Sequence, residues 1–531
     1  MQNADPALIN DDIRPTRDDE RHWSILNMAS LWVGMVVCVP AYTLAGGLVQ
    51  AGMSAWQAIG TILLGNVIIL LPMVLNGHPG TKYGVPFPVL ARASFGIFGA
   101  NIPSLIRGLV ACGWFGINTW VGGSAIYQLL LAVGWADPKA VDLLIGINPA
   151  ELVCFLVFWA AQMVVLWRGI ESIRVLETLA APVLLVMSLG LVAWAYLAAG
   201  GFGDAFAQPS QFVAGGAKEG QLWSVFLPSL TGMVGFWATL ALNIPDFTRY
   251  ARSQRDQVLG QALGLPTTMT LFAFIGVAVT SATPGIFGET ISNPIDLVGR
   301  FAQGGGGLGA AAAAFLAMFG LAIATLSTNI AANVVSPANA LINLAPSAIS
   351  FRIGGLVTGI VGILMLPWKL FEDPNGYIFV WLGGIGTLLG PVTGILVADY
   401  FVLRRTELDL DDLYRRNGRY RYVGGFNPVA LVVFVLGVLP CLPGFFRAAL
   451  SSVTQGWGRF DAPALGDWLV FAGWYLSTLG GRLELVLHLP GGLFDSLYQQ
   501  AWFVGFFIGL VLYAIAMTVV PHGSLAPREG T

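Results

Sequence analysis

The chain has 531 residues, of which 56% are hydrophobic and only 10% are charged, and its formal net charge is -3. This composition is too apolar for an ordinary soluble domain, and the small net charge gives no reason to expect nucleic acid as a partner. Apolar runs of about twenty residues are typical of membrane-spanning helices, whereas the strands of a membrane barrel alternate over about ten residues. The sequence therefore predicts an all-α polytopic protein of the lipid bilayer.

Residues 1–26 are polar and have neither the basic start nor the short apolar core of a cleaved signal peptide, so we expect a cytoplasmic N-terminal tail. The apolar runs that follow predict about twelve transmembrane helices. These spans start near Asn27, Trp56, Ile102, Pro149, Val175, Trp223, Leu259, Gly309, Gly354, Tyr377, Pro428 and Trp502. Lys and Arg are concentrated in the tail and in alternate loops, so the positive-inside rule predicts a multi-pass protein of the cell inner (plasma) membrane with both termini in the cytoplasm.

Two of the predicted spans contain helix breakers. The first contains Gly34 and Pro40, and the sixth contains Pro228 and Gly235 before Trp237. Glycine and proline are common in membrane helices, so either segment alone is equally consistent with an ordinary span. Two interrupted helices five spans apart are nevertheless typical of inverted repeats, whose broken segments hold substrate and ion near the middle of the membrane. This spacing favours a secondary transporter.

The third predicted span combines an indole and an amide on one face. Trp114 and Asn118 are four residues apart, so both side chains can meet the same ligand. An indole offers a stacking surface and a carboxamide offers a donor and an acceptor, which suits a small, neutral, flat molecule with N–H and C=O groups. Alternatively, Trp114 packs between helices and Asn118 forms an interhelical hydrogen bond. Arg107, in the same span, is expected to extend its charged group to the membrane interface.

The eighth predicted span is polar in its middle. Ser327, Thr328, Asn329 and Asn333 lie in an otherwise apolar run. Hydroxyls and carboxamides at membrane depth must find partners inside the protein or on a bound ligand. The segment is therefore a candidate binding site.

Other polar and small residues predict structure rather than a site. Gly386, Gly390 and Gly394 recur at fourfold spacing in the tenth span, which predicts a close approach of two helices. Asp246 and Arg249 follow the sixth span and are expected in a solvated cytoplasmic turn.

The predicted spans divide the chain into a transport core and peripheral parts. The ten-helix core is expected at 27–401, followed by a basic cytoplasmic loop at 402–427, two peripheral spans within 428–520 and a cytoplasmic tail at 521–531. At about 446–500 the apolar pieces are too short to cross a bilayer, which predicts an outer-loop insertion with interfacial helices. Two additional spans are the alternative for this stretch.

Five segments, in order along the chain, resemble motifs of the nucleobase:cation symporter-1 family, which includes allantoin, hydantoin, uracil and cytosine permeases. They are Asn76–Gly84, Trp114–Trp120, Asn243–Arg249, Ser327–Pro337 and Ala398–Phe401. The resemblance covers nearly all of the chain outside the predicted insertion. It implies a LeuT-type fold, in which ten core helices form two inverted repeats of five and two further helices lie at the periphery.

The resemblance also implies roles for individual residues. Trp114 and Trp237 match the two aromatic residues between which a planar ligand is stacked. Asn333 matches the amide that hydrogen-bonds the ring, and Asn118 stands where relatives commonly have Gln. Cys38 occupies a position in the first helix where relatives have Gln or Asn, so this chain lacks a side-chain amide there.

A cation site can be argued from the same segments. A desolvated Na+ needs several oxygen ligands, which carbonyls at a broken helix and nearby hydroxyls provide without a carboxylate. By the resemblance, the ligands would be the carbonyls of Gly34, Val37 and Ala324 and the hydroxyls of Ser327 and Thr328. Since no unmistakable intramembrane carboxylate is available as a proton carrier, Na+ is favoured over H+ as the coupling cation, and no other cofactor is expected.

The sequence thus predicts a secondary active transporter that imports a small planar nucleobase or related ring, of the allantoin, hydantoin or uracil type, by cation symport with alternating access. We expect it to work as a monomer. A membrane-embedded enzyme would need a catalytic constellation such as HExxH or paired intramembrane aspartates, and a channel would need a continuously polar pore. Proton coupling is an alternative, as is an amino-acid permease of the same fold, which would need a broken helix that binds a carboxylate.

Overall fold

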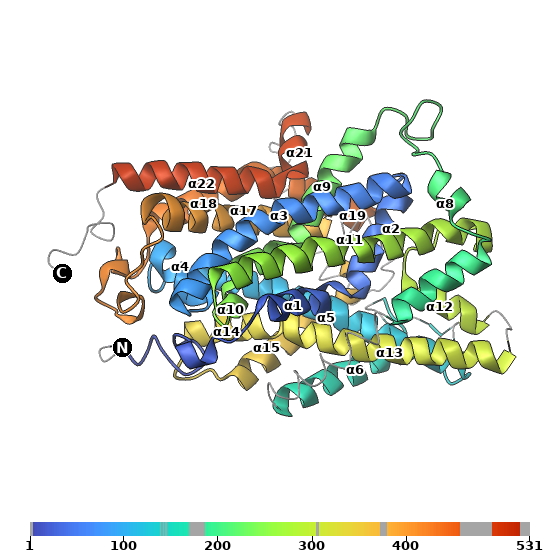
Figure 1. Cartoon of the computed structure of the whole chain (residues 1–531), viewed down its shortest axis with the longest axis horizontal. Coiled ribbons are helices and arrows are strands. Elements are labelled where there is room, and N and C mark those ends of the chain that lie inside the picture. The colour runs from blue at the N-terminus through green and yellow to red at the C-terminus, as the bar shows by residue number, and fades with distance from the viewer. Residues whose placement is uncertain are drawn as a thin grey trace.

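The computed structural model describes residues 4–137, 140, 141, 143, 146–168, 186–303, 307–371, 380–456 and 491–520. Within these residues the regular structure is helical, apart from two isolated β-bridges. Most of the long helices lie along the longest axis of the molecule (Figure 1). Nine described helices are long and apolar enough to cross a membrane, and the bent pair of α1 (Ile25–Val36) and α2 (Val39–Gln50) brings the number to ten. The described chain is therefore a polytopic α-helical membrane protein.

The described spans coincide with those predicted. After α1 and α2 they are α3 (Ala55–Tyr83), α5 (Asn101–Ala132), α6 (Pro149–Arg168), α9 (Leu222–Asn243), α11 (Gln254–Phe287), α13 (Gly307–Asn333) with α14 (Val335–Leu344), the span Val380–Leu403 that includes α17 (Gly383–Val397), α18 (Pro428–Val438) with α19 (Leu442–Gly456), and α22 (Ala501–Val519). The predicted ninth span is the shorter apolar helix α15 (Phe351–Leu364). The predicted fifth span begins outside the described residues, and its described part is the helix Val186–Ala198.

The core helices form two groups. Helices α1 and α2 pack against α11, and α3 packs against both α9 and α11, whereas α5 packs against α6, α13, α14 and α15. The two groups meet where α1 contacts α13 and α9 contacts α5. Shorter helices connect the spans: α4 (Phe87–Phe95), α8 (Gly203–Ala207), α10 (Pro245–Thr248), α12 (Pro294–Gln303), α16 (Pro367–Leu370) and α21 (Gly491–Gln499).

The first span is broken, as its glycine and proline predict. Helix α1 ends at Val36 and α2 begins at Val39, with a bend of 63° between them. Cys38 between them is extended, with φ −142° and ψ 156°, and Pro40 lies in the first turn of α2, where a helix does not need its missing N–H. The break therefore exposes backbone groups in the interior of the bundle.

The predicted interruption of the sixth span is wrong, because α9 runs continuously from Leu222 to Asn243 with Pro228 inside it. A single proline is tolerated in a membrane helix whose neighbours pack around it. Gly235 serves a different purpose, since a Cβ there would meet the carbonyl oxygen of Leu382 at 2.6 Å. The glycine lets α9 approach the start of α17 closely instead of breaking the helix.

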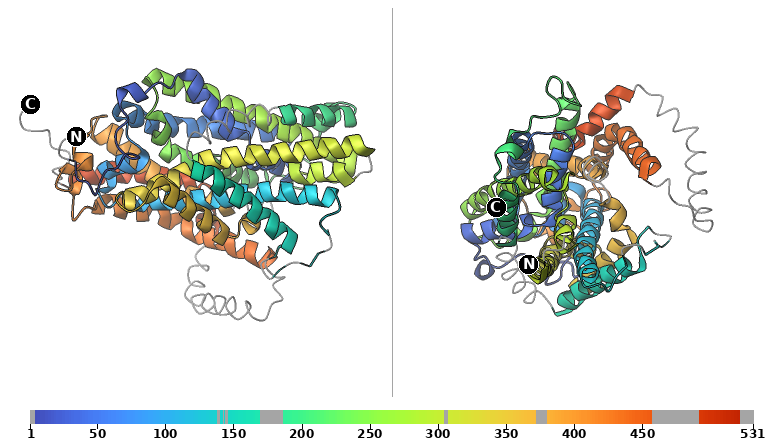
Figure 2. Two further views of the ribbon diagram at one scale, coloured as in Figure 1. Left: turned by 90° about the horizontal axis from the view of Figure 1, so that it is seen from below. Right: turned by 90° about the vertical axis from the view of Figure 1, so that its right-hand side faces the viewer.

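The N-terminal tail packs on the segment 402–427 at one end of the molecule (Figure 2). Oη of Tyr414 donates a hydrogen bond to the carbonyl of Ile13 at 2.6 Å, and Nη2 of Arg92 in α4 donates to the carbonyl of Leu8 at 3.0 Å. Apolar side chains of the tail, of α4 and of this segment form a small core of their own. The predicted tail and basic loop thus lie at the same end of the helices.

The predicted insertion at about 446–500 and the C-terminal tail at 521–531 lie largely outside the described residues. In the described part, α19 continues to Gly456 and α21 leads into α22. Arg447 of α19 and Asp495 of α21 form an ion pair at 2.7 Å, which joins α19 to α21.

Candidate functional site

A cavity lies where the break in the first span meets α5, α9 and α13, with about 400 Å³ of space between the atoms, part of which is open to solvent. Its lining consists of Met35, Cys38, Pro40, Trp114, Asn118, Phe236, Trp237, Thr239, Leu240, Thr328, Ala332 and Asn333. The structure therefore brings together all five residues that the sequence predicts to bind the substrate.

Aromatic side chains form one side of this cavity. The rings of Trp114 and Phe236 lie 5.1 Å apart, and those of Phe236 and Trp237 lie 4.8 Å apart. Trp32 meets Trp237 edge to face at 5.3 Å, and Trp381 meets Trp114 at 6.2 Å. The two indoles are thus held in place by further rings. Sequence reasoning missed Phe236, although it directly precedes Trp237 on the same helix.

Asn118 lies on the α5 face of the cavity and is 4% exposed. Its Nδ2 donates to the carbonyl of Trp114 at 3.1 Å, one turn earlier on the same helix. Its Oδ1 is buried and accepts no hydrogen bond from the described residues. A buried amide oxygen without a donor costs about 1–3 kcal/mol, so this atom is a candidate acceptor for a ligand.

Asn333 of α13 also lines the cavity and is connected to a chain of buried amides. Its Nδ2 donates to Oδ1 of Asn329 at 2.9 Å. Nδ2 of Asn329 donates in turn to the carbonyl of Phe115 at 3.0 Å and to Oε1 of Gln162 at 2.7 Å. Gln162 belongs to α6 and was missed, although a glutamine in an apolar span is itself a signal of buried polar contacts.

Three of the five predicted cation ligands, Gly34, Val37 and Thr328, lie at or contact the helix break. Cys38 N–H donates to the carbonyl of Val36 at 2.8 Å, whereas in a continuous α-helix it would bond to the carbonyl of Gly34. The released Gly34 carbonyl accepts a hydrogen bond from Oγ1 of Thr328 at 3.1 Å. Val37 lies in the break itself. Ala324 and Ser327 lie on α13, but their side chains are outside the described part of the structure.

The chemistry of this donor set fits an alkali-metal ion. Carbonyl and hydroxyl oxygens are hard ligands of the kind that Na+ and other hard cations prefer. In the described part of the chain, no group of three or more His, Cys, Asp or Glu side chains could hold a metal ion. A cation site here would therefore depend on neutral oxygens.

The prediction that Arg107 extends to the membrane interface is wrong. Its side chain is 1% exposed, and its Nε and Nη2 both donate to Oδ1 of Asn243 at 3.1 and 2.7 Å. An acceptor on the facing helix α9 lies within reach, so the guanidinium turns inward. Because Asn243 is remote in sequence, inspection of the third span alone could not reveal this partner.

Asp246 and Arg249 are also not in a solvated turn, because each is only 5% exposed. The carboxylate of Asp246 accepts hydrogen bonds from Phe87 N–H at 2.9 Å and from Oγ of Ser336 at 2.9 Å. Burial raises the pKa of Asp246 above its ordinary value. Arg249 donates to Oγ1 of Thr16 at 2.7 Å and to two carbonyls of the N-terminal tail. The segment after α9 is therefore a buried polar junction.

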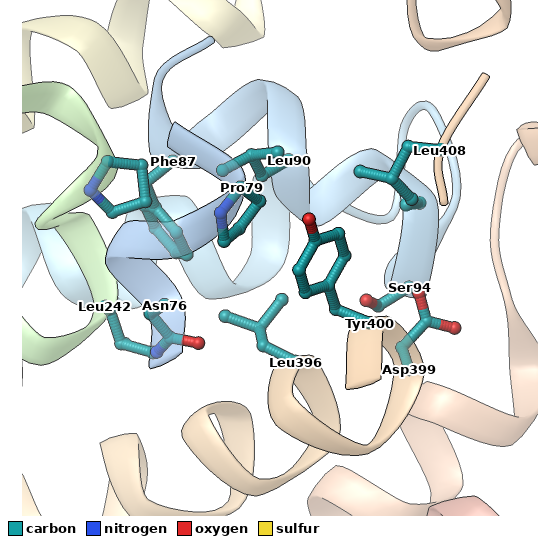
Figure 3. A pocket seen from close by; sticks show the side chains of 12 residues that line it. Asn76, Pro79, Phe87, Leu90, Ser94, Leu242, Leu396, Asp399, Tyr400 and Leu408 are labelled. Carbon is teal, nitrogen blue, oxygen red and sulfur yellow. The ribbon is translucent and has the colours of Figure 1, made fainter. Parts of the chain in front are cut away.

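A second pocket lies between α3, α4 and the Val380–Leu403 span, with Asn76, Phe87, Asp399 and Tyr400 among its lining residues (Figure 3). Its polar side chains are already engaged by the protein. Asp399 pairs with Arg404 at 2.7 Å, Oη of Tyr400 lies 2.9 Å from Nδ1 of His78, and Nδ2 of Asn76 donates to the carbonyl of Ala241. This pocket therefore offers a polar ligand fewer available hydrogen-bonding groups than the first cavity does.

Comparison with known proteins gives one family. Residues 15–459 match the family model described as permease for cytosine/purines, uracil, thiamine and allantoin. The chain is 47% identical over 490 residues to the purine-uracil permease NCS1 of Arabidopsis thaliana. This match covers 90% of this chain and 79% of that protein. It is 38% identical over 527 residues to the allantoin permease of Bacillus subtilis, with 99% and 96% covered. The hydantoin permease of Microbacterium maritypicum is 31% identical over 444 residues, with 81% and 84% covered.

Solved structures agree with this assignment. One of them is Mhp1, described as a nucleobase-cation-symport-1 family transporter in a closed conformation with bromovinylhydantoin bound. It superposes with a TM-score of 0.72 at 25% identity, and the match covers 97% of this chain and 96% of the Mhp1 chain. Its inward-facing conformation gives a TM-score of 0.73 at 26% identity, with 97% and 95% covered. A Na+-coupled sialic acid symporter at 13% identity shares the fold alone, with a TM-score of 0.58. The predicted LeuT-type fold is confirmed, and the chain belongs to the nucleobase-cation-symport-1 family of permeases.

Proposed function

We propose that this chain imports a small planar heterocycle of the allantoin, hydantoin or uracil type by symport with Na+ and alternating access. One observation carries the proposal: a single buried cavity collects two indoles and two carboxamides beside a broken helix. The relatives named above are permeases, and a family of permeases is a family of transporters, not enzymes. Alternating access needs only one copy of such a cavity, which supports a monomer as the working unit.

Ring recognition would use the two kinds of side chain differently. The faces of Trp114 and Trp237 are suited to stacking on a flat ring, because aromatic contacts add to the free energy of burial. The carboxamides of Asn118 and Asn333 would then hydrogen-bond the edge of the ring. Cys38 closes the cavity at the helix break with a small, weakly polar side chain.

Coupling would depend on the contact between α1 and α13. The carbonyls of Gly34, Val37 and Ala324 and the hydroxyls of Ser327 and Thr328 would hold Na+, whose charge these oxygens stabilise without a protein carboxylate. The Thr328 contact to the Gly34 carbonyl supports this assignment, because it already joins the two helices there. If Na+ binding favours the arrangement in which α1 and α13 are joined, it raises the affinity for the substrate. The substrate then raises the affinity for Na+ by the same factor.

We also propose that the end of the molecule formed by the N-terminal tail and residues 402–427 faces the cytoplasm. Arg415, Arg416, Arg419 and Arg421 lie in that segment, and the positive-inside rule retains such loops in the cytoplasm. With the observed direction of the spans, both termini would then be cytoplasmic in a protein of the plasma membrane.

The test is uptake of radiolabelled allantoin, hydantoin, uracil and cytosine into proteoliposomes. Each substrate is offered with an inward Na+ gradient at constant pH, with an inward H+ gradient without Na+, and with neither. We expect one or more of these rings to accumulate with the Na+ gradient, and uptake to be lost in Trp114→Ala. Trp56→Ala is the matched control, because that indole lies on α3 outside the cavity and is 65% exposed.

The arms of this experiment separate the alternatives. Uptake driven only by the H+ gradient would show that H+, not Na+, is the coupling cation, and would leave the proposed ring site unchanged. If folded protein takes up none of the four rings but takes up an amino acid, the proposal is wrong. The chain is then an amino-acid permease of the same fold. Equal loss of uptake in both tryptophan variants would remove Trp114 from the substrate site.

A further inference from the structure

The orientation of the Asn329 amide is fixed by a backbone carbonyl. Nδ2 of Asn329 lies 3.0 Å from the carbonyl oxygen of Phe115 in α5. A backbone carbonyl can only accept a hydrogen bond, so the group that faces it must be the NH2 of the amide. The same NH2 also donates to Oε1 of Gln162 at 2.7 Å. The oxygen of Asn329 therefore points the other way, toward Asn333.

This orientation dictates the orientation of Asn333. Since Oδ1 of Asn329 can only accept, the contact at 2.9 Å must be a hydrogen bond donated by Nδ2 of Asn333. The amide nitrogen of Asn333 is thereby engaged by the protein. Its Oδ1 has no partner among the described residues, and the side chain lines the cavity.

Asn118 is oriented by the same rule. Its NH2 must face the carbonyl oxygen of Trp114, 3.1 Å away, because that oxygen can only accept. Its Oδ1 is left without a donor in the described structure, although the residue is only 4% exposed. The carbonyls of two successive residues of α5, Trp114 and Phe115, thus determine the orientation of both amides of the cavity.

We infer that the cavity selects rings that present N–H donors to the two amide oxygens of Asn118 and Asn333, and that Asn329 and Gln162 are positioning residues that impose this selectivity. The inference rests on the proposed function, since it names the class of ring that the same cavity takes. A ring with CH2 or an acceptor in place of N–H leaves one of the two amide oxygens unpaired, and that of Asn118 is buried. Such a loss weakens binding about tenfold or more.

Hydantoin and succinimide form a suitable probe pair, because they are five-membered neutral rings that differ by one N–H replaced with CH2. Each is used to compete with uptake of the radiolabelled ring that the wild type transports. For a protein that takes uracil and not hydantoin, uracil is compared with 1-methyluracil and 3-methyluracil. The quantity measured is the ratio of half-inhibitory concentrations within one protein, which does not depend on how much folded transporter is present.

Five proteins are compared: wild type, Gln162→Leu and the three variants described next. Asn329→Ala removes the acceptor that holds the Asn333 nitrogen, so Asn333 can turn and present its NH2 to the ligand. Asn329→Asp is the conservative rescue, because its carboxyl in the protonated form can donate to the Phe115 carbonyl and still offer Asn333 an acceptor oxygen. Thr358→Val is the matched control, because that buried hydroxyl donates to the Gly354 carbonyl of its own helix α15 and is not among the residues that line the cavity.

We expect wild type, Asn329→Asp and Thr358→Val to prefer the N–H ring by about tenfold or more, and Asn329→Ala to lose most of that preference. Gln162→Leu should reduce it less, since Asn329 keeps its bond to Phe115. A wild type that binds a ring of the panel but does not discriminate against the missing donor overturns this inference alone, as does an Asn329→Ala variant with unchanged discrimination. A folded wild type that binds no ring of the panel overturns the proposed function and this inference with it.

Discussion

Arg107 and Asn243 are joined by two hydrogen bonds inside the helix bundle, at 3.1 and 2.7 Å. Arg107 belongs to α5 and Asn243 is the last residue of α9, so the pair connects the two groups of core helices. Nδ2 of Asn243 donates in turn to Ser336 and to the carboxylate of Asp246. The asparagine therefore connects a buried cation with a buried carboxyl group, each of which would be costly alone inside the protein.

Replacing Asn243 by Leu removes the acceptor of the buried guanidinium. We expect this change to lower the free energy of unfolding by about 2–4 kcal/mol, because a buried charge is left without its partner. Thermal unfolding of the purified protein in detergent measures the effect. Arg300→Gln is the control, since its ion pair with Glu289 is exposed and should contribute about 0–1 kcal/mol. Equal stability of the two variants would contradict the buried role of Asn243.

Asp246 should make stability depend on pH. Burial raises the pKa of Asp246 in the folded protein above the ordinary 3.8 of the unfolded chain. At pH values between the ordinary and the raised pKa, the folded protein therefore binds more protons than the unfolded chain. Stability contributed by this group therefore falls as pH rises through that window. Relative to Asp246→Asn, which cannot titrate, wild type should lose stability as pH rises from the ordinary pKa of 3.8 through the raised pKa of the folded state. The difference in Tm between the two proteins measures this, and a difference that is constant with pH would count against it.

Thr328→Val tests the cation site with little change in shape. We expect the Na+ concentration for half-maximal uptake to rise about tenfold, because one oxygen ligand and its bond to the Gly34 carbonyl are lost. Uptake at saturating Na+ should fall less. Thr358→Val, whose hydroxyl lies outside this contact, should leave the Na+ dependence unchanged. An unaltered Na+ dependence in Thr328→Val would remove that hydroxyl from the site.

Gly394 allows α17 and α22 to touch. A methyl group at this position would overlap the carbonyl oxygen of Phe506, so Gly394→Ala should cost about 1–3 kcal/mol of stability or more. Gly60 on α3 has open space around its Cβ position, so Gly60→Ala should be neutral or stabilise by about 0.5–1 kcal/mol. Thermal unfolding of both variants provides the comparison. A neutral Gly394→Ala would show that the two helices can separate at no cost.

Cys38 should report occupancy of the cavity. It lines the cavity and is 8% exposed, so a small neutral thiol reagent should inhibit uptake once the cavity opens. Saturating substrate should slow this inhibition by occupying the same space. Cys38→Ser should transport and resist the reagent. Inhibition that persists in Cys38→Ser would assign the effect to Cys112, Cys154 or Cys441, which are also free and buried.

The spans could be predicted from sequence because hydrophobic length is a local property. The break at Val37 and Cys38 was also predictable, since Pro40 cannot donate to the preceding turn. The sixth span shows the limit of this reasoning. Gly235 looks like a breaker in sequence, but its role is to admit the Leu382 carbonyl, which lies on a distant segment. Only the folded chain distinguishes a glycine for bending from a glycine for contact.

The residues of the cavity were found because indoles and amides are conspicuous in an apolar run. Asn329 stands out in the same way, but its role in orienting Asn333 does not, and Gln162 was missed, because both act through hydrogen bonds between α13, α5 and α6. Arg107 was misplaced for the same reason, since its partner Asn243 is on another helix. Polar residues in a membrane span thus signal a buried contact, whereas the partner depends on tertiary packing.

The contact between Tyr414 and the Ile13 carbonyl joins residues 401 positions apart in the chain. Chain synthesis at about 5–20 residues per second would separate the two residues by roughly 20–80 s. The Ile13 carbonyl must therefore wait for a partner that is made only after the core spans, whereas the contacts of the tail with Arg92 and Arg249 can form earlier. Attachment of the tail to residues 402–427 thus follows synthesis of the core spans, and a protease site placed beside Ile13 would gain its last protection only when this attachment forms.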